Sequence, residues 1–329
     1  MERRTFIKQS SLALVATATT TGWNMDLNSN AMHDVIIIGG SYSGLSAALA
    51  LGRSHRNVLI IDANEPCNAR VPHAHNLLTH DGVAPNILRE QAIADVVKYP
   101  TVQFLNGRAT EVTGTNGAFT VRTADGNERR SHKLLLALGV HDELPAIPGL
   151  ADCWGISAAA CPFCHGFEVS DQRLAIIGNT PDTFDYANLI RNWSPKLVVL
   201  TNGPATFSEE QRTALTGRGI VVIEQTIDKV MHDNGQVRTV HFHDGSSRAL
   251  DGLFIRSKTT VRSPFVEALG LERTEQGLIK VDPMQRTNVP GVYGIGDCTT
   301  PIRAISMAIA AGNMAGAVLT HELVVAAQH

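Results

Sequence analysis

"HDVIIIGGSYSGLSAALALGRSHRNVLIIDAN", residues 33–64, holds two short apolar runs separated by a glycine-rich turn and a segment of small residues. Val35–Ile38 and Val58–Ile61 are continuously apolar, as strands buried on both faces of a parallel sheet require. Ser43–Leu51, between them, is small and apolar and fits a helix packed closely on that sheet. The stretch therefore predicts a β-α-β unit.

The turn of this unit matches a dinucleotide-binding fingerprint at two of its three glycine positions. It reads Gly39-Gly40-Ser41-Tyr42-Ser43-Gly44, so Ser41 stands where G-x-G-x-x-G has its second glycine. Gly39 permits the tight turn, Ser41 lets the backbone approach a pyrophosphate, and Gly44 lets helix and strand pack. Asp62, at the end of the second strand, can accept hydrogen bonds from ribose hydroxyls. The alternative is an ordinary β-α-β unit with a glycine turn.

A second segment of the same kind begins at Arg173, but its turn lacks this chemistry. Leu174–Ile177 and Leu197–Leu200 are predicted strands on either side of a helix, and the turn, residues 178–183, keeps only the first glycine. The residues after the second strand, 201–203, offer neither an acid for a ribose hydroxyl nor an arginine for a 2′-phosphate. The fold is predicted to repeat, while binding of NAD(P)H is doubtful.

Length and composition limit the classes of protein and of partner that have to be considered. The chain has 329 residues, enough for two domains, and a formal net charge of −3 with no Lys/Arg-rich run, so nucleic acid is not expected as a partner. No apolar run approaches the roughly 20 residues that span a bilayer. Five cysteines in a chain of this length do not make a disulfide scaffold, and Cys67, Cys153 and Cys298 are interpreted as inert small residues.

Residues 1–31 are set apart from the fold. They contain a twin arginine, Arg3-Arg4, followed by Phe6-Ile7-Lys8 and a short, mildly apolar stretch, and so resemble a twin-arginine export signal. A periplasmic or exported protein is expected if this signal is real. The alternatives are a disordered extension or a translation start at Met32, which would leave a cytoplasmic protein.

"AAACPFCHGFE", residues 158–168, contains Cys161 and Cys164 with two residues between them. The sequence has no second such pair to complete a zinc site, and a two-residue loop gains little from a permanent disulfide. Redox catalysis is therefore the favoured interpretation, with no metal. The pair opens a predicted helix, whose N-terminus would lower the pKa of a thiol. His165 can serve as acid and base for thiol–disulfide exchange, unless it is simply a surface histidine.

Two further segments end in residues suited to a cofactor. "KLLLALGV", residues 133–140, is a predicted buried strand that ends in glycine, at Gly139. "TNVPGVYGIGDC", residues 287–298, gives a short strand, Val292–Ile295, and then Asp297, which is well placed to bind a sugar hydroxyl. A helix rich in small residues follows it.

These pieces, in this order, resemble the low-molecular-weight thioredoxin reductase family of flavoproteins, from His33 to Leu323. The resemblance implies an α/β fold of two Rossmann-like three-layer domains. A discontinuous FAD domain, placed at 32–147 and 256–329, would be interrupted by an NAD(P)H-binding-like domain at 148–255 that carries the cysteine pair. It also implies a homodimer. The "CPFCHGFE" motif is more similar to the family's dithiol oxidases, which close disulfides in natural products, than to standard thioredoxin reductases.

The resemblance implies a role for each matching position. Cys164 would face the flavin and Cys161 would exchange with the substrate, with His165 moving protons. His73 and His75 either line the flavin pocket or are solvated loop residues, and simple packing is the alternative for Ala109, Ala304 and Ile305. The implied FAD-binding residues are Gly39, Gly40, Ser41, Gly44, Asp62, Asn76, Ala109, Gly139, Asp297, Ala304 and Ile305.

The function predicted from these residues is an FAD-dependent dithiol/disulfide oxidoreductase acting on a thioredoxin-like protein or a small-molecule dithiol or disulfide. A conventional NADPH-dependent thioredoxin reductase is the first alternative. A flavin-binding sensor or scaffold without turnover is the second, although the intact cysteine pair argues against it. The sequence names neither the substrate nor the direction of electron flow.

Overall fold

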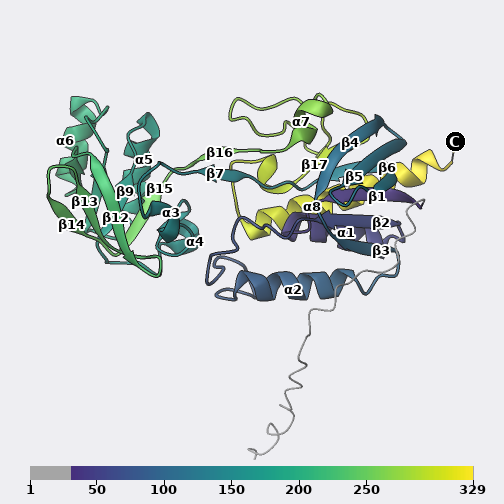
Figure 1. The fold of residues 1–329 in the computed structure, drawn as a ribbon, viewed down its shortest axis with the longest axis horizontal. Coiled ribbons are helices and arrows are strands. Elements are labelled where there is room, and N and C mark those ends of the chain that lie inside the picture. Colours follow the sequence, from purple (N-terminus) through teal and green to yellow (C-terminus); the bar gives the residue numbers. More distant parts are fainter. Residues whose placement is uncertain (1–30, 329) are drawn as a thin grey trace, which may run out of the picture.

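The computed structural model describes residues 31–328 and consists of two units joined by a narrow two-stranded ribbon (Figure 1). The ribbon pairs β7 (His141–Glu143) with β16 (Lys258–Thr260) in antiparallel fashion, and the chain passes between the units along both strands. The predicted export signal lies, apart from its last residue, outside the described residues.

The first unit is built on a seven-stranded sheet that begins with the predicted β-α-β stretch. β1 (Met32–Ile38) and β2 (Val58–Asp62) pair in parallel, with α1 (Tyr42–Arg53) between them in the sequence. The order along the sheet is β3-β2-β1-β6-β5-β4. The remaining elements of this part are α2 (Pro85–Val96), β3 (Val102–Asn106), β4 (Ala109–Thr115), β5 (Ala118–Thr123) and β6 (Glu128–Leu136).

The end of the chain returns to complete this first unit. After α7 (Pro264–Ala268), β17 (Val292–Gly294) pairs in parallel with β6, and the short 3-10 helix Gly296–Cys298 leads to α8 (Ile305–Ala326). α8 packs directly on α1: a Cβ added at Gly312 would lie 2.2 Å from the backbone oxygen of Ser43. The first unit is therefore discontinuous in sequence, as the resemblance implied.

The sheet of the first unit lies between two apolar layers. Its one face packs on α1, α2 and α8 through residues such as Leu45, Leu51 and Leu319. The other face of β1, β2 and β6 packs on β4 and β5, at the end of the same sheet, and on α7, through residues such as Phe119 and Phe265. Because β1, β2 and β6 are buried on both faces, their continuous apolar runs are explained.

The second unit repeats the pattern with a five-stranded sheet in the order β11-β10-β9-β15-β8. The predicted strands are found as β9 (Leu174–Ile177) and β10 (Leu197–Leu200), with α5 (Pro181–Ile190) between them. Its other elements are α3 (Leu150–Cys153), β8 (Ala158–Ala159), α4 (Pro162–His165), α6 (Glu209–Gly217), β11 (Val221–Ile223), β12 (Ile227–Asp233), β13 (Gln236–Phe242), β14 (Ser247–Ala249) and β15 (Gly252–Ile255).

Helices α5 and α6 cover one face of this sheet, and the antiparallel strands β12–β14 cover the other. The predicted α/β class with two three-layer units is thus confirmed. The exact limits of the two domains, at 147/148 and 255/256, stay a prediction.

Two local predictions differ from the structure. β6 ends at Leu136, so Gly139 lies in the following turn, where its φ of +64° suits glycine. The helix expected to begin at the cysteine pair is the single turn α4, with Cys161 as its N-cap. A single turn aligns few peptide dipoles, so a helix effect on the thiols is weaker than the sequence suggested.

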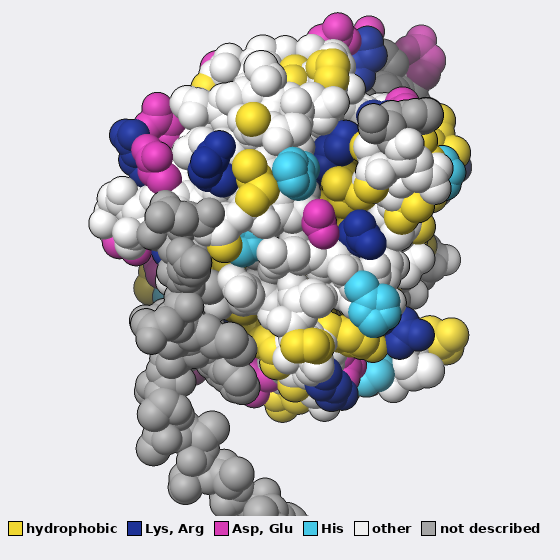
Figure 2. Space-filling view, turned by 90° about the vertical axis from the view of Figure 1, so that its right-hand side faces the viewer, with side chains coloured by type: hydrophobic (Ala, Val, Ile, Leu, Met, Phe, Trp, Pro, Cys, Tyr) yellow, Lys and Arg dark blue, Asp and Glu magenta, His cyan; other side chains and the backbone are white. Residues whose placement is uncertain are grey.

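Within the described range, α8 has the length and composition of a helix that could cross a membrane, with a mean hydropathy of 1.3. Helices of protein cores have the same character, and one face of α8 packs on α1 through Ala315, Leu319 and Leu323. On the face shown in Figure 2, Lys and Arg side chains are separated by acidic and apolar ones, so this face has no extended basic surface.

Gly312→Ala tests the close contact between α8 and α1. The added methyl group must displace backbone of α1, so we expect a loss of about 1–3 kcal/mol of stability, measured by chemical denaturation of the holoprotein. Gly217→Ala is the matched control, because a Cβ at Gly217 at the end of α6 meets nothing within 4 Å. Equal stability of the two variants would contradict the contact.

Candidate active site

A cavity of about 1100 Å³ lies between the two units and brings together most of the predicted site residues. That volume is at the upper end of the range for ligand cavities. Gly40 and Gly44 are the predicted residues that do not line it. The predicted residues on its wall are Gly39, Ser41, Asp62, Asn76, Ala109, Gly139, Cys161, Cys164, His165, Asp297, Ala304 and Ile305.

The glycine turn after β1 forms one end of the cavity and leaves backbone amides available. Gly39 has a φ of +109°, and a Cβ there would lie 2.2 Å from the backbone oxygen of Ala137. Gly44 packs beneath it, since a Cβ at Gly44 would lie 1.9 Å from the oxygen of Gly39. Ser41, the N-cap of α1, makes no side-chain capping bond, and the first turn of α1 has no acidic residue. An uncapped helix N-terminus favours an anion.

Asp62 is fixed beside this turn by two partners. Its carboxylate accepts a hydrogen bond from the Gly40 amide at 2.9 Å and is paired with Arg89 of α2. Arg89 also donates to the backbone oxygen of Gly40 at 3.2 Å. Gly40 therefore acts by orienting Asp62 rather than by lining the cavity. Arg89 was missed by the sequence analysis, because nothing in the sequence of α2 marks it as facing the turn.

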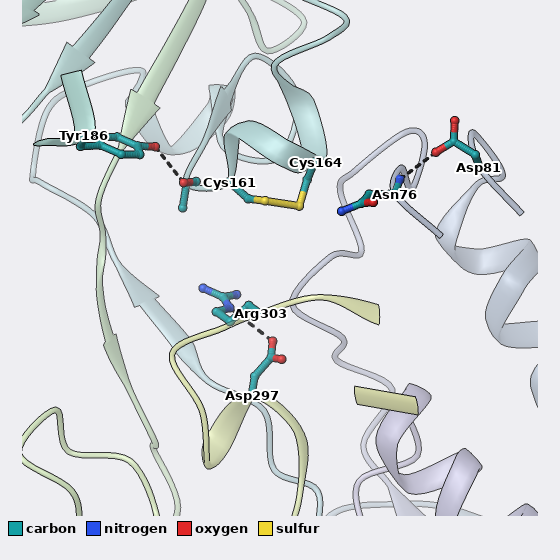
Figure 3. Close-up of a disulfide and its surroundings, with 8 residues drawn as sticks. Asn76, Asp81, Cys161, Cys164, Tyr186, Asp297 and Arg303 are labelled. Carbon is teal, nitrogen blue, oxygen red and sulfur yellow. Dashed lines mark hydrogen bonds and ion pairs between the residues drawn. A yellow bond between two sulfur atoms is a disulfide. The ribbon is translucent and has the colours of Figure 1, made fainter. Parts of the chain in front are cut away.

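Asp297 lies on the cavity wall, and the side chain of Arg303 is paired with it. Nε of Arg303 is 3.2 Å from Oδ2 of Asp297 (Figure 3). Arg303 also donates two hydrogen bonds to Asp142 of β7, at 2.7 and 3.1 Å. Burial raises the pKa of Asp297, and Arg303 partly offsets that rise. Ala304 is the N-cap of α8 and Ile305 its first residue, with no side-chain capping bond. Arg303 and Asp142 were also missed, since their pairing depends on the approach of β7 to this loop.

The cysteine pair faces this cavity from the second unit. Cys161 and Cys164 form a disulfide, with Cα atoms 5.3 Å apart, and both line the cavity. Figure 3 shows the sulfur of Cys164 on the side of the disulfide toward Asn76, and the sulfur of Cys161 on the opposite side. The buried Tyr186 of α5 donates a hydrogen bond to the backbone oxygen of Ala160 at 2.7 Å. This bond holds the backbone immediately before Cys161.

His165 follows the disulfide and lies close to a second histidine. Burial lowers its pKa, the negative charge of Glu168 raises it, and the charge of His75 lowers it. His75 contacts the segment after α4 directly, since its Nε2 is 3.4 Å from Oε1 of Glu168. His75 and His73 both line the cavity, so the interpretation of these histidines as pocket residues fits their position.

The remaining cysteines are separate from the disulfide. Cys153 and Cys298 are fully buried in the apolar cores, and burial raises the pKa of the Cys298 thiol to about 11. Cys67 is exposed on the cavity wall. Among residues 31–328, no group of three or more His, Cys, Asp or Glu side chains is arranged to hold a metal ion.

The corresponding helix of the second unit, α5, has a different N-terminus from α1. The Thr183 hydroxyl accepts a hydrogen bond from the Thr180 amide at 3.1 Å, and it fills the space above Gly178, 2.8 Å from where a Cβ would be. Pro181 provides no N–H at the first position, and Asp182 adds a negative charge to the first turn. This end of α5 is therefore unsuited to a pyrophosphate.

The residues of the cavity fit FAD, the cofactor that the sequence resemblance implied. The uncapped N-terminus of α1 and the close turn at Gly39 suit a pyrophosphate, and Asp62 suits a ribose. Asp297 and the N-terminus of α8 line the same cavity as the turn and the disulfide. The set of donors and acceptors thus runs from a dinucleotide-binding turn to the redox pair.

Comparison with known proteins gives consistent matches over nearly the whole described chain. Residues 33–315 match the family described as pyridine nucleotide-disulphide oxidoreductase. "Thioredoxin reductase sirT" of Leptosphaeria maculans is 32% identical over 86% of this chain and 92% of its own length. "Thioredoxin reductase aclD" of Aspergillus oryzae is 30% identical over 89% and 96%. A solved oxidoreductase from Agrobacterium tumefaciens superposes with a TM-score of 0.85 at 36% identity, covering 90% of this chain and 99% of that one.

Asp62→Asn tests the adenosine end of the cavity. The change removes a charged acceptor that Gly40 and Arg89 hold in place, so we expect the Kd for FAD to rise roughly 10- to 100-fold, measured by flavin fluorescence on the deflavinated protein. Asp185→Asn, at an exposed position of α5, is the control. If both variants bind FAD as tightly as the wild type, Asp62 has no part in binding.

Proposed function

Because the chain belongs to the pyridine nucleotide-disulphide oxidoreductase family, whose members bind FAD, we propose that it exchanges electrons between FAD and a substrate thiol pair through Cys161–Cys164. The observation that supports this most strongly is the position of the disulfide, on the wall of the cavity that also holds the dinucleotide-binding turn. The chain is thus an oxidoreductase of the thioredoxin reductase type, and its substrate and mechanism are what we propose here.

The cysteines take different roles in the proposed exchange. In the oxidase direction, a substrate thiolate attacks the sulfur of Cys161, the bond between Cys161 and Cys164 breaks, and Cys164 leaves as a thiolate. The second substrate thiol then attacks the mixed disulfide, which releases Cys161 and an oxidised substrate. Two electrons have then moved from the substrate to the cysteine pair. Bound FAD supplies the two-electron acceptor for that pair, or the donor in the opposite direction.

His165 is suited to the proton transfers of these steps. Burial lowers its pKa from the ordinary value, so the imidazole is largely neutral at neutral pH and can accept the proton of an attacking thiol. It can return that proton to a leaving thiolate. Asp or Glu at this position would be a weaker base, and a lysine would hold its proton.

The electron source or acceptor is proposed to differ from NAD(P)H. The capped, proline-containing and acidic N-terminus of α5 supports this proposal, because it opposes a pyrophosphate where α1 favours one. The conventional NADPH-dependent thioredoxin reductase is the alternative, and the names of the fungal relatives favour it. An exported location, proposed from the N-terminal twin arginine, would agree with a protein that meets no nicotinamide pool.

The partner is proposed to be a thioredoxin-like protein or a small-molecule dithiol or disulfide. Phe163 and Phe167, on either side of Cys164 in the sequence, are 62% and 83% exposed and offer apolar contact surface beside the disulfide. A homodimer is also proposed. Exposed apolar side chains of α8 support it, because Met307, Ile309 and Met314 of this largely apolar helix remain exposed.

Serine variants test the division of roles between the cysteines. Cys164→Ser should remove both turnover and the long-wavelength absorbance of a thiolate next to flavin. Cys161→Ser should also stop turnover but retain that absorbance, because the Cys164 thiolate can no longer close the disulfide. Absorbance spectra and dithiol turnover of the purified holoprotein give both results.

Cys67→Ser is the matched control, since Cys67 also borders the cavity but is not part of the disulfide. It should retain turnover. If the two disulfide variants turn over at the wild-type rate, the redox assignment is wrong and the scaffold alternative is favoured.

Rapid mixing with NADPH tests the proposed electron source. At millimolar NADPH we expect flavin reduction well below about 10 s⁻¹, a typical enzyme turnover, because α5 does not hold the pyrophosphate. Dithiothreitol, as the positive control, should bleach the same flavin. Fast reduction that saturates at micromolar NADPH or NADH would instead establish the conventional reductase.

A further inference from the structure

We infer that His75 and Glu168 form a positioning pair that joins the two units beside the disulfide and holds His165 for thiol–disulfide exchange. This inference rests on the proposed function. His75 belongs to the loop between β2 and α2 of the first unit, and Glu168 follows α4 of the second, three residues after His165. Their side chains meet between the two units, with Nε2 of His75 3.4 Å from Oε1 of Glu168.

The His75 ring has a carboxylate at each of its nitrogens. Its Nδ1 is 3.6 Å from Oδ1 of Asp81, which also accepts a hydrogen bond from the Asn76 amide at 2.7 Å. The ring therefore lies between a carboxylate of the first unit and a carboxylate of the second. The His75 side chain is only 21% exposed, so solvent screens its contact with Glu168 only in part.

The segment that carries His165 gains its contact with the first unit from this pair. α4 is a single turn, closed by Gly166 N to the Pro162 oxygen at 2.7 Å, and Asp171 N donates to the Trp193 oxygen at 2.9 Å, so these bonds hold the segment to the second unit. Tyr186 holds the backbone before Cys161 through its hydrogen bond to Ala160, and the ring of Phe163 within α4 packs edge-on against Trp193. The contact between His75 and Glu168 is what ties the end of the segment to the first unit.

The two members of the pair shift the pKa of His165 in opposite directions. The charged groups that face His165 are Glu168, whose negative charge raises its pKa, and His75, whose charge lowers it. The groups that face His75 are Asp81, Glu168 and His73, whose ring centroid is 6.4 Å away. Removing Glu168 should therefore lower the pKa of His165, and removing His75 should raise it.

The test uses the holoprotein with labelled histidines and follows the NMR titration of His165, which is assigned by its loss in His165→Gln. Glu168→Gln should lower the titration midpoint of His165, and His75→Gln should raise it, each by roughly half a pH unit for a partly screened charge. Glu168→Gln should also slow reduction of the Cys161–Cys164 disulfide by dithiothreitol about tenfold at pH 7, followed by alkylation and mass spectrometry.

Asp171→Asn is the matched control. Asp171 lies three residues beyond Glu168, is exposed, and has no ion pair with another residue of the described chain, and asparagine tolerates its φ of +60°. The variant removes the same charge and should behave as the wild type. The inference is overturned if the titration midpoint of His165 stays unchanged or rises in Glu168→Gln. It is also overturned if the midpoint shifts in the same direction in Glu168→Gln and His75→Gln, because loss of packing alone would expose His165 and raise the midpoint in both variants.

The proposed function fails by a different result. If dithiothreitol reduces the wild-type disulfide but leaves the flavin oxidised, electron transfer through the pair is wrong, whatever the titration of His165 shows.

Discussion

The chemistry proposed for this protein depends on one constraint: the redox disulfide and the dinucleotide-binding turn belong to different sheets, which must stay in contact. The covalent link between these sheets is limited to the two strands of the β7–β16 ribbon. The contact is therefore kept by side chains. Arg70 of the first unit donates hydrogen bonds to the backbone oxygens of Ala151 and Asp152 in α3, at 2.5 and 2.6 Å.

The two β-α-β units show how few residues separate a nucleotide site from a purely structural turn. The strands and helices of both units are equivalent in arrangement, and both sheets are buried between two layers. The difference lies in the first turn of the helix, where Gly44 in α1 corresponds to Thr183 in α5. The Thr183 side chain fills the space above Gly178 and accepts a hydrogen bond from one amide, that of Thr180, while the strand–turn–helix arrangement is kept.

Much of this structure follows from local patterns in the sequence, and the exceptions have a common cause. Val35–Ile38 and Leu174–Ile177 are apolar on both faces, so their positions in the centres of two sheets could be predicted. The redox pair was recognisable from its spacing. Arg89, Arg303 and Glu168 were not, because each acts on a partner from another element, 27, 161 and 93 residues away in the sequence. A sequence pattern reports which face a residue lies on, but not which loop approaches it.

The discontinuity of the first unit has a consequence for the order in which the chain can fold. β17 and α8 are synthesised after the second unit, and they complete the sheet and the helical layer that begin with β1 and α1. The second unit is contiguous, so it can fold while the first still lacks its C-terminal part. Asp297 and the N-terminus of α8, on the cavity wall, arrive with that final segment. The complete cavity can therefore form only after α8 has left the ribosome, which places cofactor loading after synthesis of both units.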